Sequence, residues 1–569
     1  MTLLHEQCMP SYNYITPYLL APKVQLRFSI MHDISTSLES ATMSLTSYLS
    51  YWAIKGIVSA AAFCATWSPI VSFLWISFLI YDIRKTPNAP TFAASLRLFL
   101  HLWPATLFYF AAKIAQNHED PLLVWFILIV VMRYYRTVVN LYYWFQYEPA
   151  LPNVNSKLRS EDCTVISATV GPKDNEVFDQ MVSSILFNKP SRLVFSTNTS
   201  TATIQVEEAL PAIVSALELG KSTYQRENRL HATEVSTEIL VLCADISNKR
   251  RQVVHALKAA KTAITVMADD TAIWSPHFLK ASLPAFADEK VGFVGTKKWV
   301  KREPRTYDPR KSWLANLWSN YWTGFWNTIG ALYLIRHNFE IRATNAADGG
   351  VFCVSGRTSL IRTCIIDNDR FQRNFLNEFV LRLGERFCGW GPVVADDDNF
   401  LTRYIITEGW DVKIQYSDDS TITTSLGKYP KFLGQCLRWS RTTFRQNPIA
   451  LFVDRTIWWK WPITVWTTYF PWMLNFALFW DPLMLLLFSH TQLYAASEHP
   501  KLLLAGFVGF IWTTKLVKTV PWFWKHPIDF WLYFFPIPAY PLFAYGHSVL
   551  KLWTLLTFWD VSWAGRKLP

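Results

Sequence analysis

The stretch Gln435-Cys436-Leu437-Arg438-Trp439 carries three side chains suited to a sugar and a phosphate. The Trp439 indole offers a flat apolar face on which a pyranose ring can stack. The Arg438 guanidinium can bind a diphosphate through two parallel hydrogen bonds, and the Gln435 amide can donate one more. Similar pentapeptides arise by chance on amphipathic helices, so the meaning of this one depends on its place in the chain.

The chain around this stretch has two kinds of composition. Of its 569 residues, 17% are charged and 51% hydrophobic, whereas about a quarter are charged in a typical soluble protein. The centre is typical of a soluble α/β domain and the flanks are typical of membrane segments. The predicted regions are a disordered arm (1–45), an N-terminal transmembrane region (50–147), the α/β domain (150–430), interface helices (431–460), a C-terminal transmembrane region (461–557) and a terminal segment (558–569).

Six apolar runs approach the roughly 20 residues that cross a bilayer. They are Ile57–Tyr81, Leu98–Ala115, Leu122–Tyr143, Pro462–His490, Leu502–Val520 and Ile528–His547. Buried helices of a soluble protein are the alternative. The net charge of +12 is not concentrated in a basic tract, which argues against nucleic-acid binding. Basic residues beside the runs are predicted to face anionic lipid headgroups on the cytoplasmic side, namely Arg133, Arg136, Arg438, Arg441 and Arg445.

In the central domain, short strand-like runs alternate with helical stretches. The predicted strands are Cys163–Ala168, Arg192–Ser196, Glu238–Cys243 and Ala263–Met267, separated by helices over 176–188, 206–219 and 250–261. This alternation predicts a mostly parallel sheet. Ligands bind at the carboxyl ends of such strands, so the polar residues that follow each strand are the site candidates. The eight cysteines lack metal-binding spacing and are predicted to be free thiols in a reducing compartment.

Two clusters of carboxylates have the chemistry of a catalytic site. Asp269 and Asp270 follow the fourth predicted strand and can hold Mn²⁺ or Mg²⁺. Asp396, Asp397 and Asp398 form the second cluster, and neighbouring carboxylates raise one another's pKa, which suits a general base. The structural alternatives are a strand-end turn for the first cluster and the acidic start of a helix for the second.

The order of these features resembles that of the processive, membrane-embedded family 2 glycosyltransferases, which are the cellulose, chitin and hyaluronan synthases. A carboxylate pair, a second carboxylate cluster, Gln-x-x-Arg-Trp and apolar spans follow one another over roughly residues 120–566. The resemblance implies a cytoplasmic GT-A-type α/β domain inserted between N- and C-terminal transmembrane helices. It also implies that Asp398, which precedes Leu401-Thr402, is the catalytic base, with Asp397 as its acidic neighbour.

The resemblance next implies the residues that bind the donor's diphosphate. Asp270, with Asp269, is expected to bind the metal ion, although Ala268 occupies the first position of the usual Asp-x-Asp pattern. Lys249 is expected to contact the phosphates as a point charge. A solvated helix start is the alternative for Lys249.

The resemblance also implies how the nucleotide is enclosed. Thr169 and Glu176 are expected to frame the uracil and ribose, although the family's usual Pro-x-Tyr-Asn-Glu wording is missing there. Near the C-terminus, Trp563 and Arg566 resemble the Trp-Gly-Thr-Arg gating segment, with Ala-Gly in place of the middle pair. They are expected to close over the bound nucleotide.

On the acceptor side, Cys353, Ser355 and Gly356 resemble the Cys-x-Ser-Gly segment of hyaluronan synthase-like enzymes. The sequence Ser-Gly-Arg-Thr at this place resembles that of fungal type 2 polysaccharide synthases. Small residues let a sugar approach the backbone closely. Trp439 is expected to contribute to both the donor and the acceptor side, while Gln435 and Arg438 bind the donor.

The lid role of Trp563 implies an even number of membrane crossings after Trp439, yet three apolar runs follow. We therefore expect the run Pro462–His490 to break near Asp481 and Pro482, which gives four crossings. Proline disrupts helical hydrogen bonding, and an unpaired aspartate is costly inside a bilayer.

Together the resemblance implies a processive, inverting β-glycosyltransferase of the plasma membrane. It would polymerise UDP-GlcNAc, UDP-Glc or UDP-GlcA in the cytoplasm and pass the growing polysaccharide through its own spans. Membrane lipids are its expected surroundings, and nucleic acid is not an expected partner. The alternatives are a single-transfer enzyme that acts on a lipid and a non-catalytic membrane scaffold.

Overall fold

The computed structural model describes residues 30–84, 92–152, 157–173, 175–380, 389–535 and 539–560. Trp563 and Arg566 therefore lie outside the described residues. The chain divides into two compact units, Met1–Phe63 and Cys64–Pro569, and the second holds the sheet and the site. Helix α1 (Ile30–Arg84) begins inside the predicted arm 1–45, and residues 1–29 lie outside the described residues. Its Met, Leu, Glu and Ala residues support a helix despite the polar residues between them.

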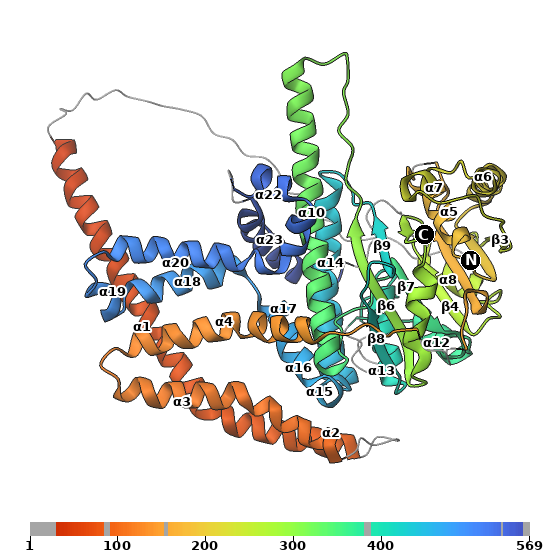
Figure 1. Cartoon of the computed structure of the whole chain (residues 1–569). Coiled ribbons are helices and arrows are strands. Elements are labelled where there is room, and N and C mark those ends of the chain that lie inside the picture. Colours follow the sequence, from red (N-terminus) through yellow and green to blue (C-terminus); the bar gives the residue numbers. More distant parts are fainter. Residues whose placement is uncertain are drawn as a thin grey trace, which may run out of the picture. The chain divides into compact units, whose positions relative to one another are not determined.

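Nine strands of the described residues form one sheet in the order β3-β2-β1-β4-β7-β6-β9-β5, with β8 beside β6 (Figure 1). The strands are β1 (Cys163–Thr169), β2 (Arg192–Thr197), β3 (Glu238–Cys243), β4 (Ile264–Ala268), β5 (Ala272–Trp274), β6 (Val291–Val300), β7 (Thr358–Arg362), β8 (Asp411–Gln415) and β9 (Thr421–Thr424). The first four pair in parallel, which confirms the prediction from the alternating pattern. Only the β4–β7, β6–β7 and β5–β9 pairings are antiparallel among the described strands.

Helices cover both faces of the parallel part of the sheet. The helices of the domain are α5 (Phe178–Phe187), α6 (Ser200–Glu218), α7 (Thr223–Asn228), α8 (Lys249–Leu257), α9 (Phe278–Ser282), α10 (Trp313–Asp348), α11 (Thr363–Ile366), α12 (Asp369–Leu376), α13 (Asp397–Thr407) and α14 (Lys431–Pro448). Val165 of β1 packs into the cluster formed with α5 and α6, whereas its neighbour Ile166 packs into the cluster that contains α8. Such two-sided burial explains why β1 lacks an alternating polar pattern.

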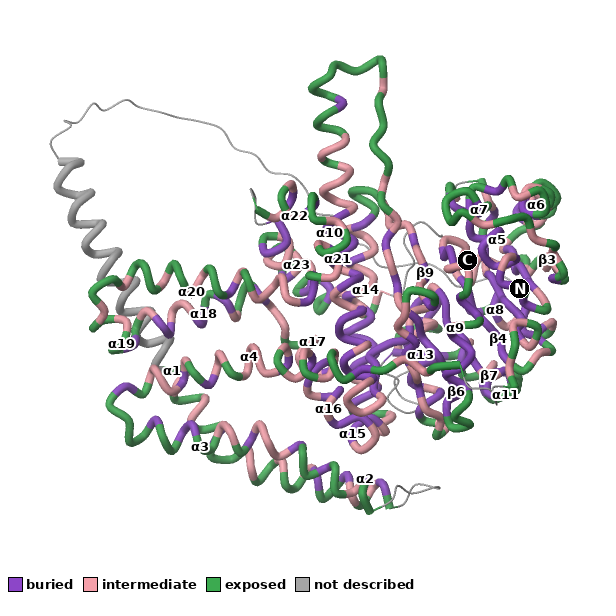
Figure 2. Tube along the Cα trace, in the orientation of Figure 1, coloured by how far each residue is buried: buried purple, intermediate pink, exposed green. Residues whose placement is uncertain are grey.

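The remaining helices of the described residues are mostly apolar. They are α2 (Phe92–Arg97), α3 (Trp103–Asn117), α4 (Pro121–Gln146), α15 (Ile457–Lys460), α16 (Pro462–Thr464), α17 (Phe470–Leu474), α18 (Ala477–Ser489), α19 (Gln492–Ala495), α20 (Pro500–Thr514), α21 (Val520–Lys525), α22 (Pro527–Tyr533) and α23 (Ala539–Leu555). Figure 2 shows the sheet mostly buried, whereas α3 and α20 carry many exposed residues. Exposed apolar helix faces of this length are typical of contact with lipid.

Four helical segments of the described residues are long and apolar enough to cross a membrane. They are Val58–Arg84, Phe92–Asn117, Pro121–Gln146 and Pro500–Lys525. The predicted run Ile528–His547 is not one helix, because α22 ends at Tyr533 and α23 begins at Ala539. Neither α22 nor α23 is among the described segments long and apolar enough to cross a membrane, so the described residues give no single span there.

The apolar run after α14 breaks earlier than predicted. Pro462–Leu474 and Ala477–Ser489 are bent by 92° at Asn475, not at Asp481. Asp481 lies buried within α18, where its carboxylate pairs with Lys515 at 2.6 Å and with Arg133 at 3.4 Å. These pairs offset the cost of burying the charge, so the helix continues through it. Helices α18 and α20 pack together as a hairpin joined through α19 (Figure 1).

Candidate active site

The two carboxylate clusters meet at the carboxyl end of β4. Asp269 directly follows that strand, and Asp397 is the first residue of α13. The Lys249 ammonium lies between them, 2.8 Å from Asp269 Oδ1 and 3.0 Å from Asp397 Oδ2. Burial acts to lower the pKa of Lys249, but the two carboxylates outweigh it and raise that pKa. Lys249, predicted to contact the phosphates, thus joins Asp269, a predicted metal ligand, to Asp397, the predicted neighbour of the catalytic base.

The turn that leads into α13 is fixed by a buried ion pair. Asp396 has a left-handed backbone (φ 60°), and its carboxylate accepts hydrogen bonds from Arg445 Nε at 2.7 Å and from Thr442 Oγ1 at 2.6 Å. Arg250 donates to the carbonyl oxygen of the preceding Ala395 at 2.7 Å. Burial acts to raise the pKa of Asp396, but Arg445 outweighs it and keeps that pKa below its usual range. A left-handed non-glycine residue costs about 1–2 kcal/mol, so these contacts hold a strained turn that aims the next two carboxylates.

Asp398 is half-buried against the Cys353–Gly356 segment. Its Oδ2 accepts the Gly356 N–H at 3.2 Å, and its Oδ1 accepts the Asn399 N–H at 2.9 Å. A Cβ at Gly356 would lie 3.3 Å from Asp398 Cβ, so glycine permits this close approach. Burial, and next the Asp397 carboxylate, raise the pKa of Asp398. A raised pKa makes this carboxylate a stronger proton acceptor, which is what a general base requires.

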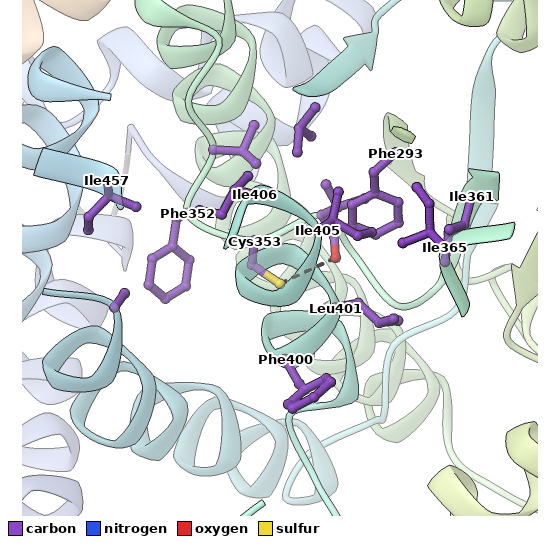
Figure 3. Packing of buried hydrophobic residues seen from close by; sticks show 14 of the residues in the cluster. Phe293, Phe352, Cys353, Ile361, Ile365, Phe400, Leu401, Ile405, Ile406 and Ile457 are labelled. Carbon is purple, nitrogen blue, oxygen red and sulfur yellow. Dashed lines mark hydrogen bonds between the residues drawn. The ribbon is translucent and has the colours of Figure 1, made fainter. Parts of the chain in front are cut away.

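Apolar packing holds α13 in place behind Asp398. Phe400, Leu401 and Ile405 of this helix belong to a buried cluster that also contains Cys353 and Phe352 (Figure 3). Fully burying a large apolar side chain contributes about 1.5–3 kcal/mol, so the position of the helix is strongly determined. Burial, and next the Asp398 carboxylate, also raise the pKa of the Cys353 thiol well above its ordinary value, so this cysteine is neutral.

The end of β1 joins the first carboxylate cluster through Thr169. Its hydroxyl donates to Asp270 Oδ2 at 2.8 Å, and Asn175 Nδ2 donates to the Asp270 carbonyl oxygen at 2.6 Å. Glu176 lies apart from this group, with its side chain 86% exposed and Lys428 at 4.0 Å. The structure therefore brings Thr169 and Asp270 together but not Glu176.

The carboxylates of this site suit a divalent metal ion only when the phosphates of a bound nucleotide supply further ligands. Among the described residues, no group of three or more His, Cys, Asp or Glu side chains could hold a metal ion. Mg²⁺ is commonly held by one or two carboxylates together with the phosphates of its substrate. Asp269 and Asp397 converge on the Lys249 ammonium, and Asp270 follows directly, so oxygen ligands of the right kind are present.

An open cavity of about 1010 Å³ extends from Asp398 to the pentapeptide on α14. Cys353, Ser355 and Trp439, three of the residues predicted on the acceptor side, line it together. Trp439 stacks on Tyr333 with ring centroids 5.4 Å apart. Gln435 has a structural contact instead, because its Oε1 accepts the Gly427 N–H at 3.2 Å.

Several residues of this cavity were not predicted from the sequence. Arg357 directly follows the Ser355-Gly356 pair, and its guanidinium lies 5.4 Å from the centre of the Trp439 ring. Lys298 of β6 lines the same cavity, where burial, and next Arg357, lower its pKa to about 7. Arg357 could have been found from its place in the motif. Lys298 and Tyr333 carry no such signal, because they resemble ordinary strand and helix residues.

Two arginines predicted to face lipid headgroups instead hold the end of the described chain. Arg445 Nη1 donates to the carbonyl oxygens of Phe558 at 3.1 Å and Asp560 at 2.9 Å. Arg441 forms an ion pair with the Asp560 carboxylate at 2.6 Å. The headgroup prediction is wrong for both, since their positions on α14 direct them toward acceptors within the protein. Arg445 thus contacts both Asp396 and the segment that leads toward Trp563.

Comparison with known proteins agrees with this geometry. A family model described as "Glycosyltransferase like family 2" matches residues 231–442. A "Type 2 glycosyltransferase" of Pyricularia oryzae is 31% identical over 477 residues, which cover 82% of this chain and 87% of that protein. One of Gibberella zeae is 32% identical over 445 residues, covering 76% of this chain and 74% of that protein.

More distant similarities extend the comparison. An NDP-glycosyltransferase of Aspergillus luteorubrus is 26% identical over 234 residues, covering 41% of this chain and 53% of that protein. The solved structure of a mannosyltransferase from Pyrobaculum calidifontis, in complex with GDP-Man and Mn²⁺, has 14% identity and a TM-score of 0.41, covering 76% of this chain and 98% of that one. On the fungal relatives and the family match, this chain belongs to the type 2 glycosyltransferases, sugar-transferring enzymes of glycosyltransferase family 2.

Proposed function

We propose that this glycosyltransferase is a processive, inverting β-glycosyltransferase that builds a polysaccharide from a UDP-sugar and passes it across a membrane. One observation carries the proposal. The cavity beside Asp398 adjoins a second cavity of about 830 Å³ between the apolar helices, and the two share Arg336, Asn475 and His547. We propose that a product leaving Asp398 enters the helical region past these three residues, a route that a single transfer to a lipid does not need.

The site residues divide the transfer between them. Asp398 accepts the proton of the acceptor hydroxyl while that oxygen bonds to the anomeric carbon of the donor. The bond from that carbon to the diphosphate breaks on the opposite face, and UDP leaves. Trp439 supplies a platform for the acceptor sugar at the mouth of the cavity. Lys249, now paired with Asp269 and Asp397, can exchange these partners for the donor's phosphates.

A divalent metal fits beside Asp269 and Asp270 once phosphates are present. When bound, Mn²⁺ or Mg²⁺ supplies positive charge that neutralises the diphosphate. Lys249 and the carboxylates set where the diphosphate lies, and Thr169 orients Asp270 through the hydrogen bond at 2.8 Å.

The proposal includes a membrane location. The four apolar helical segments support integral insertion. We place the catalytic domain in the cytoplasm, where UDP-sugars are found, and the helices in the plasma membrane. Trp563 and Arg566 are proposed to close over the nucleotide from the chain segment that Arg445 holds.

Asp270→Ala is expected to weaken Mn²⁺-dependent UDP binding by roughly 10- to 100-fold, because a ligand and the partner of Thr169 are lost together. Isothermal titration with UDP, with and without Mn²⁺, measures this. Asp369→Ala, an exposed carboxylate at the start of α12, is the matched control and is expected to bind as the wild type does. Equal UDP affinity with and without Mn²⁺ in the wild-type enzyme would refute the metal role.

The proposed activity is tested by incubating the purified full-length enzyme with UDP-GlcNAc, UDP-Glc and UDP-GlcA, singly and in pairs. UDP release identifies the donors, and gel electrophoresis measures the product size. Long products are expected. A product of one sugar on a lipid would favour the single-transfer alternative, and absence of UDP release with every donor would favour a scaffold.

A further inference from the structure

The charged side chains that line the cavity between the apolar helices are all basic. They are Arg133, Arg136, Arg336, Lys515 and Lys518. These residues come from α4, α10 and the segment between α20 and α21, so the chain brings cations to one cavity from separate parts of the sequence. The adjoining cavity adds Lys551 of α23 close to the junction between the two, and it is also lined by the carboxylates of Glu340 and Asp398. We call the two joined cavities the passage.

Nearby carboxylates compensate only part of this charge. Asp481 pairs with Lys515 and Arg133, and Glu340 pairs with Lys518 at 2.7 Å. No ion pair involves Arg136, Arg336 or Lys551 in the part of the chain that the structure describes. Within the described ranges, the Lys551 ammonium donates only to backbone carbonyl oxygens, those of Trp472 and Asn475.

Two of these guanidinium groups also hold unused hydrogen-bond donors. Arg136 is only 8% exposed, and its Nη1 has no hydrogen-bond partner among the described residues. The same is true of Arg336 Nε, although the Arg336 guanidinium lies over the Tyr333 ring at 4.6 Å. The sequence prediction that Arg136 faces lipid headgroups is wrong, because it lines the passage instead.

Unpaired cations in such a place indicate an anionic occupant. A buried charge without a partner costs several kcal/mol, and charged residues among membrane helices typically face a substrate pathway. A neutral glycan needs aromatic faces and neutral hydrogen-bonding groups, which Trp439, Tyr333 and Asn475 already provide. The guanidinium and ammonium groups that line the passage are not required for binding a neutral glycan.

We propose that the passage takes an anionic glycan, in which sugars carry carboxylates, so that one donor is a nucleotide-linked uronic acid. This inference rests on the proposed function and narrows its substrate class. The cations line both cavities, from Lys551 to Lys515, which matches repeated charge along a polymer better than the single phosphate group of a lipid. Carboxylates pair with guanidinium groups through charge-assisted hydrogen bonds.

Binding to the full-length Asp398→Asn protein, in which sugar transfer is expected to be strongly slowed, tests the inference directly. The probes are a β-linked octasaccharide with a uronic acid at every second sugar and the same octasaccharide with its carboxylates reduced to hydroxymethyl groups. The anionic probe is expected to bind at least roughly tenfold tighter at low salt, and the preference is expected to shrink as salt rises. Equal affinity for the two probes would overturn the inference.

Variants in the same background show where the preference arises. Arg136→Gln and Arg336→Gln are each expected to remove most of the preference, whereas Arg136→Lys keeps the charge and retains most of it. Arg310→Gln removes a guanidinium from an exposed position outside the passage and is the matched control. Thermal unfolding of each variant checks folding. A preference that survives in the double Arg136→Gln/Arg336→Gln variant would contradict the role of the passage.

The product made by the wild-type enzyme distinguishes failure of this inference from failure of the proposed function on which it rests. A long neutral polymer would leave processive synthesis standing and refute the anionic glycan. Transfer of one sugar to a lipid, or no transfer, would refute both. Tight binding of polyprenyl phosphate, without discrimination between the two octasaccharides, would assign the cations to a lipid phosphate and also refute the inference.

Discussion

Replacing Asp398 by Asn is expected to lower the rate of sugar transfer by roughly 10²- to 10⁴-fold, the usual contribution of a general base. The amide keeps the shape of the side chain but cannot accept the acceptor's proton. UDP affinity is expected to change little, because the hydrogen bonds of Asp398 run to the Gly356 and Asn399 backbone rather than to the phosphate cluster. UDP release and equilibrium binding of UDP measure the two effects separately.

The control for this variant is Asp369→Asn on the exposed start of α12, which is expected to transfer sugar at the wild-type rate. The raised pKa of Asp398 adds a further expectation. The base acts in its ionised form, so transfer should rise with pH through a pKa above that of a free aspartate. Near wild-type transfer by Asp398→Asn would show that another group takes the proton.

Arg445→Met is expected to destabilise the protein by about 3–5 kcal/mol, because it leaves the buried Asp396 carboxylate without its cation. The double variant Asp396→Asn/Arg445→Met removes both charges and is expected to recover most of that loss. Unfolding of the four proteins of this cycle in detergent gives the coupling energy. Arg445→Met is also expected to reduce transfer, since the turn before Asp397 and Asp398 loses its anchor.

Arg441→Gln is the matched control for this cycle. Arg441 lies one helical turn before Arg445 and pairs with Asp560, whose side chain is 38% exposed. An exposed pair of this kind contributes at most about 1 kcal/mol. If Arg445→Met and Arg441→Gln had equal and small effects, the buried pair would not be the anchor of the active-site turn.

The part of the fold that depends on local pattern could be predicted from the sequence. The run Cys163–Ala168 and the three similar runs are β-branched and apolar, and the helices between them leave a parallel arrangement as the natural solution. The site at their carboxyl ends follows from that topology, which is why Asp269, Asp270 and Thr169 were found together.

The features that depend on contacts between residues far apart in the sequence could not be predicted. Asp481 looked like a helix break because an isolated aspartate is costly among apolar residues, but Lys515 and Arg133 compensate it from two other helices. Arg445 looked like a headgroup contact because its partner, Asp396, lies far away in the sequence. Glu176 was assigned from a loosely matching loop, and its exposed side chain shows how little such a match determines position.

Processive synthesis through the passage is the central claim, and a pulse–chase measurement tests it most directly. The enzyme first extends chains with radiolabelled UDP-sugar and then receives a large excess of unlabelled UDP-sugar and of free oligosaccharide acceptor. The account predicts that the labelled chains stay bound and continue to lengthen, while the added acceptor remains unextended. Labelled products that stop at their initial short length while the added acceptors grow would contradict it.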